Sequence, residues 1–111
     1  MDDRTRRIGE NETLFRRLNE EVEGVNRSFA TLTYTMDLVC ECGDLDCLER
    51  FVVPIELYER VRGDATRFFV LAGHVNDDIE DVVERRDGYV IVEKRPGPPA
   101  DVAEQTDPRS G

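Results

Sequence analysis

The chain has 111 residues, enough for one small domain, and its 25 acidic and 15 basic residues give a net charge of −10 at pH 7. Binding to nucleic acids or anionic membranes depends on basic side chains facing phosphates, so this charge argues against both kinds of partner. It favours a protein partner with a basic surface.

The expected compartment is the cytoplasm. No apolar run reaches the roughly 20 residues of a membrane-spanning helix, and no signal peptide opens the sequence. In a reducing compartment, clustered cysteines favour metal binding over disulfides.

Residues 1–29 predict an amphipathic helix, with Gly24 and Asn26 indicating its end. Its apolar positions recur at helical spacing and form a seam of Ile8, Phe15, Leu18, Val22 and Val25. One interpretation packs this seam against the rest of the chain. The alternative is a short coiled coil, in which Asn11 sets the register of a homodimer.

Residues 30–95 predict a small α+β zinc-binding domain, which begins with a strand. From Thr31 the apolar period is two, which places Leu32, Tyr34, Met36 and Leu38 on the buried face. Cys40 and Cys42 continue this face. Two residues along a strand span about 6.5–7 Å, so both sulfurs can reach one metal only if the chain bends. Gly43 allows that bend.

The following elements complete an α+β fold. Residues 51–53 predict a second strand, 56–62 a short helix ended by Gly63, and 68–72 a strand that leads to His74. Two further strands flank a hairpin turn at Gly88. We expect the N-terminal helix and the short middle helix to pack on a small antiparallel sheet of about four strands. Residues 96–111 hold four of the five prolines and are expected to form a disordered tail.

The three cysteines and the sole histidine form the candidate site. Cys40, Cys42, Cys47 and His74 make a complete tetrahedral ligand set for zinc, with 26 residues between Cys47 and His74. The alternatives are buried thiols without a metal, and redox-active thiols. A disulfide would leave one cysteine unpaired.

Acidic residues around the cysteines bear on these alternatives. Glu41, Asp44, Asp46 and Glu49 would raise the thiol pKa values, which opposes a reactive thiolate. The same negative charge attracts a divalent cation.

The ligand set also bears on function. If all four residues bind zinc, the shell is closed, which favours a non-enzymatic protein-interaction or regulatory module. If His74 is not a ligand, the fourth position opens and Glu41 or Glu49 could act as a base. The protein would then be a small zinc enzyme or a thiol sensor. The zinc-deaminase, zinc-protease and phosphate-loop motifs are absent.

Three segments carry a resemblance: Leu38 to Asp44, Ala72-Gly73-His74, and Val83-Glu84-Arg85 before Gly88-Tyr89-Val90. They resemble a group of short, uncharacterised bacterial proteins of GC-rich, actinobacterial type. The resemblance covers most of the chain. It implies that the Cys/Cys/Cys/His set is a site of that group, and it implies no activity.

Overall fold

The computed structural model describes residues 3–27, 34–44, 46–47 and 49–109 and, in the first helix, the side chains of residues 9–23. It is an α+β fold, as predicted. In chain order its elements are α1 (Asp3–Arg27), β1 (Thr35–Val39), β2 (Arg50–Pro54), α3 (Ile55–Arg62), β3 (Arg67–Leu71), the 3-10 turn η1 (Ala72–His74), β4 (Glu80–Arg85), β5 (Tyr89–Lys94) and α4 (Pro98–Gln105).

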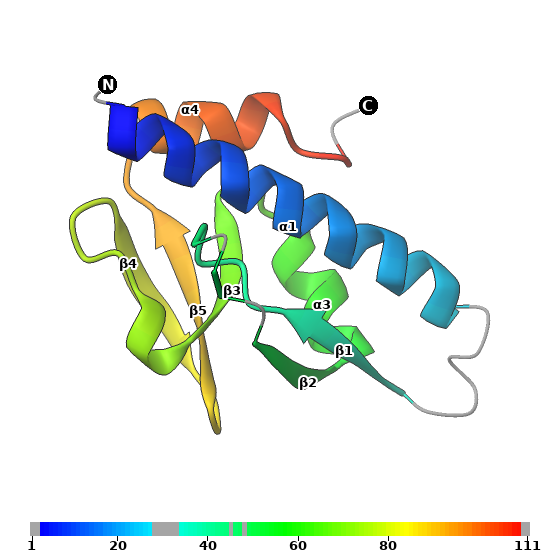
Figure 1. The fold of residues 1–111 in the computed structure, drawn as a ribbon. Helices are drawn as coiled ribbons and strands as arrows, with labels where there is room; N and C mark the ends of the chain where they lie inside the picture. The colour runs from blue at the N-terminus through cyan, green and yellow to red at the C-terminus, as the bar shows by residue number, and fades with distance from the viewer. Residues whose placement is uncertain (1–2, 28–33, 45, 48, 110–111) are drawn as a thin grey trace.

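The strands form two antiparallel sheets instead of the single sheet expected. β1 pairs with β2, and the second sheet has the order β3-β5-β4. The two sheets are joined just after β1, where the backbone N–H of Glu41 donates to the carbonyl of Phe69 at 2.8 Å. Helix α1 crosses the strands, with α4 beside its N-terminal half (Figure 1).

The β1–β2 pair confirms most of the predicted period of two. Met36 and Leu38 are buried and Asp37 is exposed. The prediction is wrong for Tyr34, which is 72% exposed. Its φ of +58° shows that the extended conformation begins only at Thr35. Leu32 lies outside the described residues.

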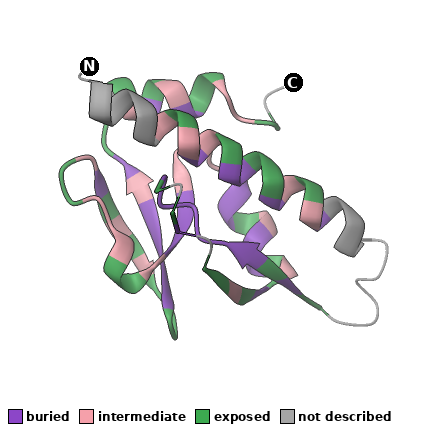
Figure 2. Ribbon diagram, in the orientation of Figure 1, coloured by how far each residue is buried: buried purple, intermediate pink, exposed green. Residues whose placement is uncertain are grey.

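The buried side chains form two clusters, on opposite faces of β3 and β5, because successive residues of a strand point to opposite sides. The first, here called the apolar core, consists of Met36, Leu38, Val53, Leu57, Tyr58, Val61, Phe69, Tyr89 and Ile91. The second, the thiol core, consists of Cys40, Cys42, Cys47, Phe68, Val70, Val90, Val92 and Ala103. Figure 2 shows β5 buried along most of its length between them.

Helix α1 exists as predicted, but its buried face differs from the predicted seam. Phe15 is buried, whereas Leu18 is 41% exposed. The face toward the strands is mainly polar, with buried side chains at helical spacing: Glu12, Arg16, Asn19 and Glu23. The side chains of Ile8 and Val25 lie outside the described part.

Distant partners explain this burial. Arg16 donates to the carbonyls of Ala65 at 2.6 Å and Ala103 at 2.8 Å, and its guanidinium lies 4.7 Å from the centre of the Phe68 ring. Glu12 accepts a hydrogen bond from Lys94, which also donates to Glu80 at 2.5 Å. Buried polar groups are tolerated when they are hydrogen-bonded in this way.

The prediction of a disordered tail is wrong for most of residues 96–111. Pro98 and Pro99 stand in the first turn of α4, where a missing N–H costs no helical hydrogen bond. Ala100 and Ala103 are buried, and small side chains let α4 lie close to α1. A Cβ atom at Gly9 would be 3.6 Å from Val102, an ordinary contact between the two helices.

Two smaller predictions are confirmed. Gly88 has a φ of +87° in the turn between β4 and β5, and Leu57, Tyr58 and Val61 are the buried apolar residues of α3.

Across the described helices, no stretch has the length and apolarity that crossing a membrane requires.

Candidate metal centre

The structure brings the four predicted ligands together from three places. Cys40 directly follows β1, Cys42 and Cys47 lie in the connection to β2, and His74 ends η1 after β3. One potential ligand atom from each residue lies within 4.8 Å of all the others. The Nδ1 atom of His74 is 3.7 Å from the Cys40 sulfur and 3.3 Å from the Cys47 sulfur.

These separations suit a single metal ion. Zinc bonds of about 2.3 Å to sulfur and 2.0–2.1 Å to nitrogen place tetrahedral ligand atoms about 3.5–3.8 Å apart. The atoms here need to move only by about an ångström or less to meet that geometry. The three cysteines are buried and His74 is partly exposed. The four residues can therefore hold a metal ion.

The predicted bend at Gly43 is present. β1 ends at Val39, and Gly43 has a φ of +84°, a conformation that favours glycine. The carbonyl of Asp44 then accepts a 2.9 Å hydrogen bond from the N–H of Cys47, which turns the chain back. This turn brings Cys47 to the sulfurs of Cys40 and Cys42.

Each sulfur also accepts a backbone hydrogen bond. The N–H of Leu71 donates to Cys40 at 3.3 Å, and the N–H groups of Asp44 and Glu49 donate to Cys42 and Cys47. Such donors stabilise a thiolate, and outer hydrogen bonds of this kind orient metal ligands. These N–H groups favour the thiolate form and act against the burial of the three cysteines, which favours the thiol.

The thiol pKa values correct one expectation. The Cys40 thiol donates a hydrogen bond to Cys42, which raises the pKa of Cys40 and lowers that of Cys42 to about 5. Burial raises the pKa of Cys47. The predicted increase from nearby acids is thus wrong for Cys42, because neighbouring thiols and backbone N–H groups control its titration.

Glu41 does not have the role of a catalytic base that the sequence allowed. Its side chain is fully buried and forms an ion pair with the equally buried Arg62. It also accepts hydrogen bonds from the amide of Asn19 at 2.8 Å and from the N–H of Phe69 at 2.9 Å. A carboxylate held this way is unavailable as a base at the metal. Glu49, the other candidate base, is exposed.

Two asparagines of α1 hold the ligand-bearing segment and were not predicted to do so. The amide of Asn19 donates to the carbonyl of Val39 and accepts from its N–H, both at 2.9 Å. Asn11 donates to the carbonyl of Gly43 at 2.8 Å. The sequence held one signal for this role. Both asparagines lie on the helix face that carries the apolar residues, so their side chains would be expected to face the rest of the chain.

No family model, curated protein or solved structure matches the chain. The assignment of the site therefore depends on its geometry and chemistry.

Proposed function

We propose that the protein is a small, non-enzymatic zinc-binding protein of the bacterial cytoplasm that acts as a protein-interaction or regulatory module. The observation that carries the proposal is the convergence of three buried thiols and one imidazole within 4.8 Å. Soft sulfur ligands with a histidine in tetrahedral arrangement favour zinc over calcium, magnesium or manganese.

The non-enzymatic part follows from the same ligand set. Four protein ligands fill a tetrahedral shell and leave no position for an activated water. The ion pair of Glu41 with Arg62 removes the nearest candidate base. A closed site of this kind stabilises structure, because metal binding and folding are coupled.

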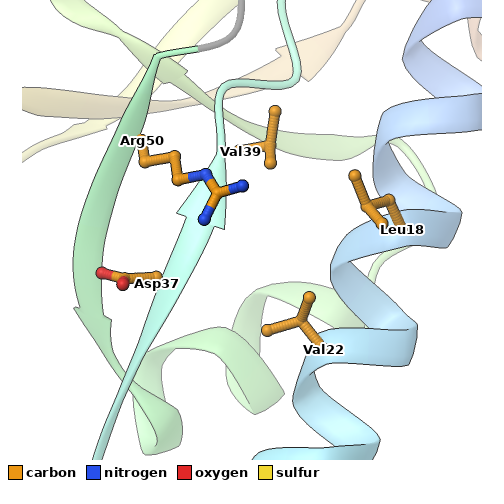
Figure 3. Close-up of a pocket in the computed structure, with 5 residues that line it drawn as sticks. All are labelled: Leu18, Val22, Asp37, Val39 and Arg50. Atoms are coloured by element: carbon orange, nitrogen blue, oxygen red, sulfur yellow. The ribbon is translucent and has the colours of Figure 1, made fainter.

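A partner with a basic surface fits the net charge of −10. A groove of about 290 Å³ between α1 and the β1–β2 pair offers apolar contacts (Figure 3). It is lined by Leu18, Val22, Asp37, Val39 and Arg50. Leu14 and Val52, 56% and 57% exposed, are further apolar surface residues. A homodimer through α1 stays a prediction, although Phe15 and Asn11 are engaged within the chain.

Elemental analysis and X-ray absorption of the purified protein test the proposal. We expect one zinc per chain, bound by three sulfur atoms and one nitrogen atom. His74→Ala should replace the nitrogen by oxygen or abolish binding. An oxygen ligand in the unsubstituted protein would contradict the closed shell and favour a zinc enzyme.

A thiol sensor is the second candidate, and the lowered pKa of Cys42, about 5, favours it for protein without metal. If the purified protein contains no metal, this candidate predicts that alkylation at pH 6 modifies Cys42 before Cys40 or Cys47. Mass spectrometry of the peptides would identify the modified residue.

A further inference from the structure

The segment 39–43, here called the ligand segment, has different neighbours at alternate residues. Its even residues, Cys40 and Cys42, direct their sulfurs to the metal centre. Each of its odd residues contacts an asparagine of α1. Asn19 bonds to the backbone of Val39 and to the side chain of Glu41, and Asn11 bonds to the carbonyl of Gly43. The conformation of this one segment therefore determines both ligand placement and the contacts of α1.

Apolar burial contributes little to the docking of residues 9–23 of α1. Within the described side chains of this helix, Phe15 is the one apolar residue that is buried, and Val22 is partly buried. The remaining buried positions are polar and depend on partners at fixed places. The contacts of Asn11 and Asn19 are to the ligand segment, whereas Glu12 bonds to Lys94 and Arg16 bonds to Ala65 and Ala103. Hydrogen bonds are directional, so displacement of the ligand segment removes the bonds of Asn11 and Asn19.

The apolar core depends less on α1 and the ligand segment. None of its buried members belongs to either, although the partly buried Val22 of α1 packs against it. It joins the β1–β2 pair, α3 and one face of the second sheet. These elements stay packed when the segment rearranges around Cys40 and Cys42, provided that Glu41 keeps its bonds to Arg62 of α3 and Phe69 of β3.

From this arrangement we propose that the metal ion controls the docking of α1. This inference rests on the proposed zinc function and concerns the regulation of that site. With zinc bound, the ligand segment is fixed and α1 docks. Without zinc, the segment relaxes and α1 leaves the strands, while the apolar core stays folded. The groove of Figure 3 then loses the wall formed by Leu18 and Val22, so that it exists only in the metal-bound state.

Hydrogen exchange followed by mass spectrometry tests the proposal on the full chain. Zinc-loaded protein is compared with protein stripped by a chelator, and elemental analysis verifies the zinc content of each sample. We expect the amides of residues 9–23 to exchange at least about tenfold faster without zinc, and those of α3, β3 and β5 to keep their protection. Equal exchange of α1 in both states, or loss of protection throughout the chain, would overturn the proposal.

A variant separates this inference from the proposed function. Coupling is reciprocal, so Asn19→Ala, which weakens α1 docking, should also weaken zinc binding, by about 5- to 150-fold in a competition titration. The exposed neighbour Arg17→Ala is the matched control and should change neither docking nor affinity. If Asn19→Ala frees α1 and the zinc affinity is unchanged, the coupling is wrong although the zinc site stands. If the unsubstituted protein binds no zinc, the proposed function itself fails, and the inference fails with it.

Discussion

The apolar core and the region formed by α1 and the ligand segment are built from different interactions. The apolar core contains aliphatic and aromatic side chains, including a stacked pair in which the Tyr58 and Phe69 rings lie 5.7 Å apart. The α1 region buries charged and amide groups that bond to residues up to 90 positions away, as in the contact of Arg16 with Thr106. The first region gains stability from the apolar surface that is removed from water, and the second from hydrogen-bond and ion-pair partners at the correct positions. Substitutions should therefore have graded effects in the first and abrupt effects in the second.

The largest effect is expected for Arg62→Met. This change leaves the Glu41 carboxylate buried without its ion-pair partner, which should lower the free energy of unfolding by about 3–5 kcal/mol. Urea denaturation with zinc present measures it. Adding Glu41→Leu should recover part of the loss, since no unpaired charge is then buried, while the Phe69 N–H and the Asn19 amide lose this acceptor. A loss below about 1 kcal/mol for Arg62→Met would contradict the account of this region.

Leu57→Ala should act through the apolar core alone. Leu57 is a buried residue of α3, and removing its side chain should cost about 2–5 kcal/mol in denaturation experiments. The zinc affinity of the folded variant should be unchanged, in contrast to Asn19→Ala. The exposed neighbour Glu56→Ala is the control and should change stability by less than about 0.5 kcal/mol. A large loss of zinc affinity in Leu57→Ala would show that the two regions are not separate.

Glu12 should make the stability of the α1 region depend on pH. Burial raises the pKa of Glu12 to about 8, although the nearby Lys94 opposes the shift. Between its unfolded value of 4.5 and about 8, the native state then holds a proton that the unfolded state has lost. Stability should therefore fall as pH rises through this window, by at most about 1.4 kcal/mol per pH unit.

Glu12→Gln isolates this contribution, because glutamine stays neutral and can still accept a hydrogen bond from Lys94. Denaturation between pH 6 and 8, with zinc saturating, should give a flatter dependence for the variant. Parallel curves for the two proteins would show that Glu12 is ionised in the native state across this range.

The smallest effect is expected for Arg109→Ala. Arg109, whose side chain is partly exposed, donates hydrogen bonds to Glu20 of α1 and to Glu59 of α3. Ion pairs of this kind contribute about 0–1 kcal/mol, and salt screens them. The loss should be measurable by thermal denaturation at low ionic strength and should shrink at 1 M salt. A loss that does not depend on salt would point to packing of Arg109 on the Tyr58 ring, 5.8 Å away.

The local patterns of the sequence predicted the apolar core well. Alternation marked Met36 and Leu38, helical spacing marked the buried face of α3, and Gly88 marked the hairpin turn. The apolar residues are buried, and Gly88 occupies its turn, because of their own chemistry, so neighbours in the chain are enough to predict their environment. The same holds for the ligand set, since three cysteines and one histidine have few alternative partners.

Only the tertiary structure decided which face of α1 is buried, where the Glu41 side chain points, and that half of the tail folds as α4. The residues concerned are polar, or small and close to prolines, and taken alone they predict exposure to solvent. They are buried because segments distant in the chain supply the hydrogen bonds, the opposite charges and the close-packed surface that each requires. The sequence by itself therefore determined the candidate metal-ligand set and the apolar core, and the tertiary structure determined how α1 and the tail are attached to them.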